Sequence, residues 1–433
     1  MKFRFVNIRC IFAALLMCGA ASAHAQLRLP SLPLPGQIGP LGLDGLDGLD
    51  GLRRTVEPLL DRRPLPDLAS LRQDTVRELL RAHPDVLEAD PHGEPALRGE
   101  VVAVAPSDAA LGAARAAGAL VVRDGTLPGL GERIVVLRLP EGSATAALVE
   151  QLRALDADGS YDFNHVYTGS GAAGGVGAGT GAAVRIGLVD SGVDGTHPVF
   201  EDAAITRWGC DGKTVPAAHG TAVAALMVGR SDHLRGAAPG AALYASDVYC
   251  GSPAGGGADR IAAALGWLDQ QDVGVVNISL VGPPNALLAR TVAAMQARGH
   301  LLVAAVGNDG PAAPPLYPAS YPGVVGVTAV DRRGRPLPEA ARGPQVKFAA
   351  PGSQMVSAAP GTPPYRQVRG TSFAAPIVAA LLAQHLPRPD RTAAARAVET
   401  LARAAGGAQA APNDETGYGI VGAGVRTDPS ALR

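Results

Sequence analysis

The stretch RIGLVDSGVDGTHP, residues 185–198, decides the fold class of this chain. A run of branched and small apolar residues ends there in an aspartate and a glycine-containing turn. Similar apolar runs recur further along and alternate with alanine-rich segments of helical length, such as 258–271 and 286–299. Continuous apolar runs suit strands that are buried on both faces, as in parallel sheets covered by helices. We therefore expect residues 184–433 to form a doubly wound, mostly parallel α/β domain.

The composition of the whole chain is that of a globular protein. Its 433 residues carry a formal net charge of −1, with 47% hydrophobic and 18% charged residues. This balance provides ample apolar surface for a core, and the length allows two or three domains. The sequence has no block of basic residues interleaved with aromatic ones, so we expect no nucleic-acid partner.

The first 25 residues are typical of an export signal. Lys2, Arg4 and Arg9 precede a short apolar run, and small residues follow in ASAHA, residues 21–25. A membrane anchor is the weaker alternative, because the apolar run is too short to span a bilayer. We therefore expect a secreted or periplasmic protein with no membrane partner.

Export also bears on the four cysteines. Cys10 and Cys18 belong to the signal, which leaves Cys210 and Cys250. Two thiols in an oxidising compartment favour one disulfide, which would close a loop of about 40 residues and contribute about 3–4 kcal/mol through chain entropy. Two free buried thiols are the alternative, because the spacing matches no metal motif.

Three segments separate the signal from the α/β domain. Residues 26–64 are rich in Pro, Gly and Leu and contain LDGLDGLDGL; a linker is favoured over a calcium-binding repeat, because glycine-rich calcium repeats have a longer period. Residues 65–168 alternate strand and helix patterns in the order β-α-β-β-α-β, which predicts a small ferredoxin-like α+β unit. Residues 169–183 are almost free of side chains and predict a Gly-rich linker.

Three polar residues stand at the ends of apolar elements. Asp190 ends the strand of the opening stretch, at the edge where open α/β sheets gather their ligand groups. His219 opens the apolar helix of AAHGTAVAALMVG, residues 217–229, and Ser372 stands where a helix begins in RGTSFAAPIVAALLA, residues 369–383. Taken alone, Asp190 could simply cap a turn and His219 could be structural.

Together, and in this order, the motifs DSG, HGT and GTSFAAP resemble those of the subtilisin-like serine protease family. VAAVGNDGP, residues 303–311, is similar to the oxyanion segment of that family, and VVNISL, residues 275–280, to its substrate-binding strand. The resemblance covers about residues 184–425. It implies catalytic roles for Asp190, His219, Ser372 and Asn308. It also implies that substrate contacts Ser279, Leu280, Val281, Gly282, Ala305, Val306 and Gly307.

The chemistry agrees with these assignments. A serine hydroxyl is a poor nucleophile without an adjacent base, which His219 can supply while Asp190 orients the imidazole. The side chain of Asn308 and the backbone N–H of Ser372 would stabilise the oxyanion. Two positions depart from the family pattern: Ala222 replaces a histidine, which predicts a packing role, and Val281 replaces a glycine at the pocket wall.

The resemblance implies an exported serine endopeptidase that is made as a zymogen, acts on polypeptides and works as a monomer. Residues 65–168 resemble the family's pro-domain, an intramolecular inhibitor, and we expect self-cleavage between residues 166 and 183, with Tyr167 directly before the cut. No cofactor is required and no metal ligands are assigned; a structural calcium stays open. The alternatives are a non-catalytic binding protein with the same fold and an ester hydrolase with the same triad. Asp309 is interpreted as a solvated acid near the pocket.

Overall fold

The computed structural model describes residues 71–169, 184–406, 411–426 and 429. The predicted signal, the linker 26–64 and the segment 170–183 lie outside the described residues, so the structure does not bear on them.

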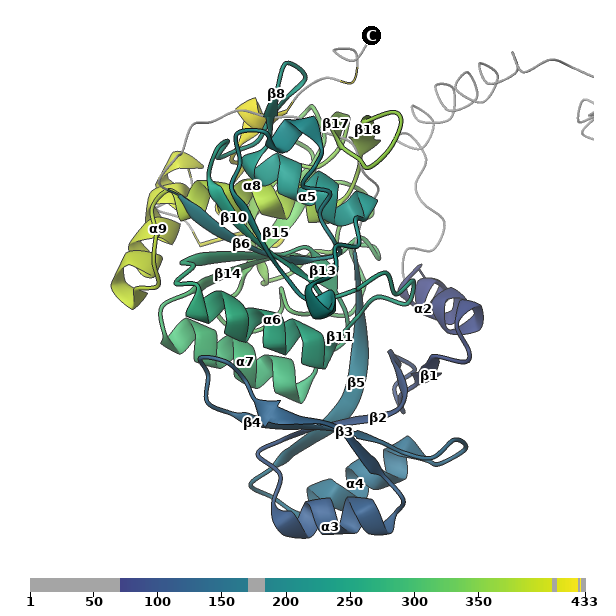
Figure 1. Ribbon diagram of the computed structural model, residues 1–433. Helices are drawn as coiled ribbons and strands as arrows, with labels where there is room; N and C mark the ends of the chain where they lie inside the picture. Colours follow the sequence, from purple (N-terminus) through teal and green to yellow (C-terminus); the bar gives the residue numbers. More distant parts are fainter. Residues whose placement is uncertain (1–70, 170–183, 407–410, 427–428, 430–433) are drawn as a thin grey trace, which may run out of the picture. The chain divides into compact units, whose positions relative to one another are not determined.

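One parallel sheet forms the centre of the domain that begins at residue 184 (Figure 1). Its strands lie in the order β16-β15-β14-β12-β6-β10-β7, and each neighbouring pair is parallel. The bounds are β6 Arg185–Asp190, β7 Ile205–Trp208, β10 Ala242–Asp247, β12 Val275–Ile278, β14 Leu301–Ala305, β15 Val325–Val330 and β16 Val346–Pro351. After β6 the chain adds β7 and β10 on one side and then crosses to β12 on the other. The order reverses between β6 and β12, and doubly wound sheets bind their ligands at such a point.

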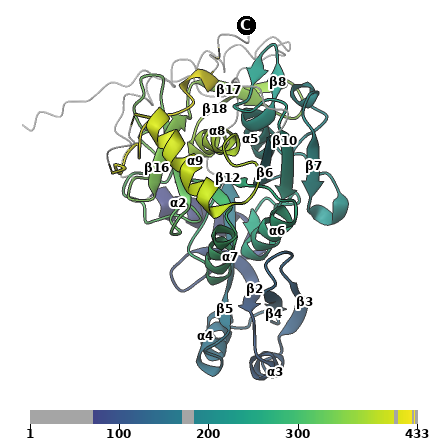
Figure 2. The ribbon, with the colours of Figure 1, turned by 90° about the vertical axis from the view of Figure 1, so that its left-hand side faces the viewer.

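Helices cover both faces of this sheet, which confirms the predicted α/β class (Figures 1 and 2). α5 Ala218–Val228 and α8 Thr371–Ala383 pack on one face, and α6 Ala258–Gln270 and α7 Ala286–Ala297 pack on the other. α5 and α8 are apolar on nearly every side because both are enclosed. Ala222 is fully buried in α5, in accord with its predicted packing role. In the described part of the chain, no helix is long and apolar enough to cross a bilayer.

The remaining elements of this domain are short or peripheral. α9 Arg391–Ala404 packs against α8, and two hairpins pair β8 Arg230–Ser231 with β9 Leu234–Arg235 and β17 Met355–Ala358 with β18 Tyr365–Val368. Single 3₁₀ turns are formed by Pro198–Phe200, Cys210–Gly212 and Ala423–Val425.

An antiparallel sheet forms the centre of residues 71–169, with strand order β5-β2-β4-β3. The elements are β2 Pro95–Val104, α3 Asp108–Ala116, β3 Leu120–Thr126, β4 Arg133–Arg138, α4 Thr145–Leu155 and β5 Ser160–Gly169. They follow the order β-α-β-β-α-β that the sequence predicts for this unit. α3 and α4 cover one face of the sheet and share a small apolar core with it. α2 Leu71–Ala82 and β1 Leu87–Ala89 come before them and have no counterpart in the prediction.

Strand β5 is shared by two sets of strands. Residues 160–165 pair with β2, whereas residues 166–169 pair with two short strands of the α/β domain, β11 Gly256–Gly257 and β13 Leu280–Val281. Gly169, the first residue of the predicted linker, is therefore the last residue of β5. The two sheets meet along this strand, and β5 also lies against α6 and α7.

Candidate active site

Asp190 and His219 meet at the carboxyl edge of the parallel sheet. Asp190 is the last residue of β6 and fully buried, and its Oδ1 lies 2.8 Å from Nδ1 of His219 in the first turn of α5. Ser191 donates its backbone N–H to the same Oδ1 at 2.7 Å, and its Oγ accepts the N–H of Gly220 at 3.0 Å. These bonds tie the end of the strand to the start of the helix. The carboxylate is placed to hold the Nδ1–H tautomer of His219, with Nε2 as the basic nitrogen.

Ser372 stands at the N-terminus of α8, directly after the turn at Gly370. Gly370 has φ 129°, a conformation that L side chains rarely adopt. The Ser372 hydroxyl donates to the carbonyl of Ser279 at 3.0 Å, and the Ser279 hydroxyl donates to the carbonyl of Ser372 at 2.8 Å. The ring of Phe373 lies 5.3 Å from that of His219, centroid to centroid. His219 Nε2 is buried and has no hydrogen-bond partner within the described residues.

Pro376 explains why the carbonyl of Ser372 is available for Ser279. Proline has no N–H, so the carbonyl four residues earlier in a helix loses its usual partner. Pro376 lies inside α8, and the carbonyl four residues earlier is that of Ser372. The Ser279 hydroxyl, which itself accepts a bond from Asn277 at 2.9 Å, takes the place of the missing donor. Because Pro376 donates no hydrogen bond, the start of α8 is instead bonded to Ser279, the residue directly before β13.

Asn308 is held by the same helix start. Its Oδ1 accepts the N–H of Thr371 at 3.0 Å, and the Thr371 hydroxyl accepts the N–H of Gly307 at 3.2 Å. Ala305, Val306 and Gly307 are buried at the end of β14, directly before it. These bonds hold the Asn308 side chain at the start of α8, one residue before Ser372, which is compatible with its predicted oxyanion role.

The strands β11 and β13 form the two walls of a groove that β5 occupies. On one wall Leu280 pairs with Gly169 and Val281 with Thr168. On the other wall, β11 runs antiparallel to Val166 and Tyr167. β5 is therefore the middle strand of three antiparallel strands. Ser279 and Gly282, which complete the predicted substrate-binding set on this side, flank β13 directly.

The prediction that Tyr167 directly precedes the cut stays a prediction, and the surroundings of Tyr167 speak against it, because Gly169 and not Tyr167 lies against His219. Tyr167 is fully buried, and its hydroxyl donates to the carbonyl of Pro283 at 2.6 Å. A Cβ on Gly282 would lie 2.5 Å from the Tyr167 ring, so only glycine at position 282 leaves room for it. Gly169, two residues later, lies against His219 instead. The sequence shows a large apolar side chain near the cut, but not which pocket along the groove receives it.

Tyr249, just beyond β10, contacts β5, and the sequence analysis does not assign it any role. Its hydroxyl accepts the backbone N–H of Gly169 at 2.7 Å. Burial, together with the nearby Asp190 and Asp247 carboxylates, raises the pKa of the Tyr249 phenol well above its usual range, so the group stays neutral. The glycine-rich stretch that follows, residues 255–257, was a usable signal, because such a segment allows close approach of another backbone.

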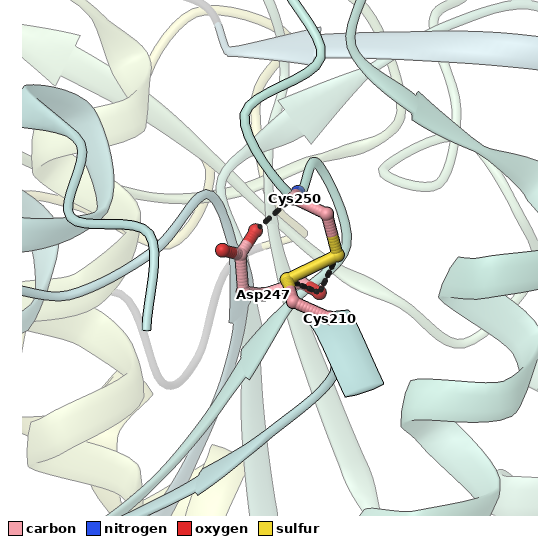
Figure 3. A group of neighbouring side chains, drawn as sticks. All are labelled: Cys210, Asp247 and Cys250. Carbon is pink, nitrogen blue, oxygen red and sulfur yellow. Dashed lines mark hydrogen bonds between the residues drawn. A yellow bond between two sulfur atoms is a disulfide. The ribbon is translucent and has the colours of Figure 1, made fainter. Parts of the chain in front are cut away.

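Cys210 and Cys250 form the disulfide that their number and compartment predict (Figure 3). Their Cα atoms lie 5.1 Å apart, and 40 residues separate them in sequence. Asp247 lies beside the bridge, with its carbonyl 3.7 Å from each sulfur. These three residues are the one group in the described ranges with metal-ligand spacing. Because the two sulfurs are bonded to each other, they are not available as thiolate ligands.

Asp309 is not the solvated acid that the sequence analysis expects. Burial raises the pKa of its carboxyl group, and Arg72 of α2 lies 3.5 Å from its Oδ2. The Arg72 side chain is only 7% exposed and also pairs with Glu94 at 2.5 Å. The correction has a physical cause. The sequence analysis did not predict α2, so the guanidinium group of Arg72 was missing from the expected surroundings of Asp309.

The fold and this constellation define a class: an α/β protein with an aspartate–histidine pair, a serine at a helix N-terminus and a groove that holds an extended strand. The model of the subtilase family, peptidase S8, matches residues 181–419, more than half of the chain. This chain therefore belongs to the subtilase family, as its motifs predicted.

Individual relatives agree with the family assignment. M-protease from Shouchella clausii (strain KSM-K16) is 34% identical over 215 residues, which are 47% of this chain and 54% of that protein. Subtilisin Savinase from Lederbergia lenta is 32% identical over 211 residues, 46% of this chain and 75% of that protein. The chain thus spans about half the length of the first relative. Fervidolysin from Fervidobacterium pennivorans, a keratinolytic enzyme related to subtilisin, shares the fold: its crystal structure aligns with a TM-score of 0.62 at 20% identity, over 79% of this chain and 63% of that one.

Proposed function

We propose that this chain is an exported serine endopeptidase that is made as an inactive precursor. Asp190, His219 and Ser372 form its triad, and Asn308 is the side-chain donor of its oxyanion hole. Residues 1–25 are the export signal, 26–64 a linker, 65–168 the pro-domain, 169–183 the segment in which cleavage occurs, and 184–433 the peptidase domain. Its substrates are polypeptides.

One observation carries the proposal: a segment of the chain itself lies in the groove as an extended strand. An endopeptidase must bind its substrate extended, because the scissile carbonyl has to be exposed and held in register. Addition of a peptide as a strand between two existing strands supplies backbone hydrogen bonds that do not depend on sequence. β5 is bound in this way between β11 and β13, beside Ser372 and His219.

The triad would act in two steps. The Ser372 hydroxyl turns from the Ser279 carbonyl to Nε2 of His219, gives up its proton there and attacks the carbonyl carbon of the substrate. The peptide C–N bond then breaks as the proton passes from Nε2 to the departing amine. Water hydrolyses the acyl ester by the same path, with His219 again as the base. Asp190 stabilises the imidazolium in both steps, and Asn308 stabilises the oxyanion.

The contacts of residues 71–169 support their role as an intramolecular inhibitor. Asp162 of β5 accepts the N–H of Ala286, at the N-terminus of α7, at 2.8 Å, and Asn285 donates to the carbonyl of Phe163 at 3.0 Å. At the start of α6, Asp259 pairs with Arg123 of β3. A negative charge at a helix N-terminus is favourable, so Asp162 helps to hold β5 in place. The strand blocks the groove and reaches the catalytic histidine.

The register of β5 supports a proposal for the cleavage site. Gly169 pairs with Leu280, the residue that directly follows Ser279. The carbonyl of Ser279 is the group that the Ser372 hydroxyl touches. We therefore propose that self-cleavage occurs directly after residue 170, within the window expected from the sequence.

A comparison of wild type with Ser372→Ala tests the function. The proposal expects a fluorophosphonate to label wild type at Ser372 and a fragment that begins at residue 171 to appear by mass spectrometry. Ser372→Ala should give neither the label nor the fragment. Ser246→Ala is the control, since its buried hydroxyl has no hydrogen-bond partner among the described residues and Ser246 is not one of the proposed site residues; it should behave as wild type.

Three results would contradict the proposal. Processing that persists in Ser372→Ala would assign the cut to another enzyme. Absence of labelling in wild type would favour the non-catalytic alternative. Labelled wild type that hydrolyses small esters but cuts no peptide would favour the ester hydrolase.

A further inference from the structure

The wall formed by β11 ends before the groove does. β11 pairs with residues 166 and 167 of β5, and two residues later the described part of the chain has no strand on that side. The N–H of Gly169 nevertheless has an acceptor on this side, the Tyr249 hydroxyl at 2.7 Å. A side-chain phenol thus provides the hydrogen bond that a backbone carbonyl would provide in a longer strand.

Tyr249 is fixed in this position by its neighbours in sequence. Oδ1 of Asp247 accepts the backbone N–H groups of Tyr249 and Cys250, both at 2.9 Å. Cys250 is joined to Cys210 by the disulfide, as Figure 3 shows. The carbonyl of Tyr249 accepts the N–H of Ser252 at 2.9 Å, which closes the turn. A binding group held in this way loses little freedom when it takes up a ligand.

The space beside Gly169 is closed by His219. A Cβ at position 169 would lie 2.9 Å from Nε2 of His219 and 3.0 Å from Cδ2 and Cε1 of the same ring. A shift of the imidazole away from such a side chain would disturb its 2.8 Å hydrogen bond to Asp190. Gly169 itself has a backbone conformation that any residue could adopt, so the restriction comes from the missing space and not from φ.

We propose that Tyr249 is a substrate-binding residue and that, with His219, it makes the enzyme select glycine at one subsite. This subsite binds the second residue before the scissile bond. The residue that follows it in the substrate supplies the scissile carbonyl. The Tyr249 hydroxyl accepts the backbone N–H of the residue in this subsite, and the His219 ring excludes a side chain. The proposal rests on the function proposed above, and the substrates it defines are polypeptides with glycine at this position.

An amide-to-ester exchange in the substrate tests the hydrogen bond directly. One peptide carries VYTGSGAA, the sequence of residues 166–173, between a fluorophore and a quencher. A second peptide carries glycolic acid in place of the glycine, which replaces the N–H by an oxygen and adds no side chain. Enzyme obtained from the full-length chain is compared with Tyr249→Phe. Tyr244→Phe is the control, a tyrosine of β10 whose hydroxyl contacts Arg185 outside the groove.

The expected result is a loss of kcat/KM in one combination only, that of Tyr249→Phe with the amide peptide. Tyr249→Phe should lower kcat/KM for the amide peptide about fivefold to tenfold, the worth of one net hydrogen bond of about 1 kcal/mol. It should change kcat/KM for the ester peptide less than twofold, and Tyr244→Phe should change neither. Equal losses on both peptides, or no loss on either, would overturn the role of Tyr249.

Glycine selection is tested by a third peptide with alanine in place of that glycine. We expect wild type to cleave it at least about fivefold more slowly, because displacing His219 or the peptide costs about 1–3 kcal/mol, and 1 kcal/mol corresponds to about fivefold in rate. In the precursor, Gly169→Ala should slow self-cleavage similarly, whereas Gly125→Ala should not, since its Cβ would meet nothing within 4 Å. Equal cleavage of the alanine and glycine peptides would overturn this subsite. If wild type cuts no peptide in a Ser372-dependent way, the proposed function fails instead.

Discussion

The two sheets of this protein differ in how they are buried and in what holds them. The parallel sheet is covered by helices on both faces, and its strands β6, β12 and β14 are almost wholly buried. The antiparallel sheet has a small core of its own under α3 and α4, its residues Val102, Val104 and Ile134 are buried in a cluster with α6 and α7, and its edge strand β3 is exposed throughout. All proposed catalytic residues belong to the first region. The second region contributes β5, the strand proposed to block them.

The contact between the two regions is both apolar and polar. Val102, Val104 and Ile134 of the antiparallel sheet belong to the same buried apolar cluster as residues of α6 and α7. The polar part consists of the end of β5, a carboxylate at the N-terminus of α7, and ion pairs such as Arg290 with Glu132 at 3.0 Å. Polar contacts of this kind give register and orientation, but contribute less to stability than a shared apolar core of similar size. The comparison teaches that the proposed chemistry lies within the parallel-sheet region, whereas the proposed inhibition depends on contacts between the two regions.

The largest expected effect falls on the parallel sheet. His219→Ala removes the base, so we expect kcat to fall by about 10³-fold or more and the precursor to stay uncut. Peptide turnover and gel analysis of the expressed chain measure both. His233→Ala, an exposed histidine outside the site, is the control and should be unaffected. Activity that survives in His219→Ala would mean that the chemistry does not lie in this region.

The second effect concerns stability and also belongs to the α/β domain. Replacing Cys210 and Cys250 together by serine removes the disulfide, and we expect the free energy of unfolding to fall by about 3–4 kcal/mol. Urea unfolding of uncut Ser372→Ala protein, with and without the serine pair, measures it. An unchanged unfolding midpoint would mean that the bridge does not stabilise this region.

The third effect tests the polar contact between the regions. Asp162→Asn keeps a side-chain oxygen but removes the charge at the N-terminus of α7, which should weaken the hold of β5 by about 0.5–1 kcal/mol. Activity should then appear about twofold to fivefold faster after cleavage. Asp85→Asn, an exposed carboxylate of the same unit, serves as the comparison and should leave the rate unchanged. Identical rates for Asp162→Asn and wild type would show that this charge does not hold the inhibitor.

The smallest effect is a pH dependence confined to the antiparallel region. Hydrogen bonds from the Tyr161 hydroxyl and the Ser107 backbone N–H hold the pKa of Asp156 well below its usual range. A lowered pKa stabilises the fold above the unfolded value of about 3.9, and this contribution is lost as the pH falls. Asp156→Asn should therefore weaken this unit at pH 7, and the difference from wild type should shrink below about pH 4.

Hydrogen exchange of β2 and α4 in the uncut Ser372→Ala chain measures this difference between pH 3 and pH 7. Asp158→Asn, exposed in the same loop, is the control. A difference that stays constant down to pH 3 would contradict the proposed role of the ionised carboxylate.

The sequence predicts the fold class and the position of Asp190 well, because both follow from local patterns: a buried apolar run needs a covered sheet, and its polar end must lie at the sheet's edge. The order of elements in the antiparallel unit follows from local periodicity in the same way. The pairing of Cys210 with Cys250 followed from counting cysteines after the signal was set aside.

Other features depend on long-range register, which local patterns do not determine. The place of Tyr167 depends on how β5 aligns with β13, more than 100 residues later, and a shift of two residues changes which pocket receives it. The surroundings of Asp309 depend on a helix near residue 72, far away in sequence. No sequence motif marks Tyr249 itself, although the glycine-rich stretch 255–257 follows it. Its contact with Gly169 arises only because β11 is too short to reach Gly169.

The disulfide has a consequence for the proposed protease when it meets other copies of itself. His219 and the whole of α5 lie between Cys210 and Cys250, inside a closed covalent ring. The ring includes the exposed residues 211–214 and the turn at residues 232–233, where an attacking copy finds accessible backbone. One cut at either place opens the ring but releases no fragment, because the sulfur bridge still joins both ends. The segment that carries the catalytic base is thus tethered against the first cut of self-digestion.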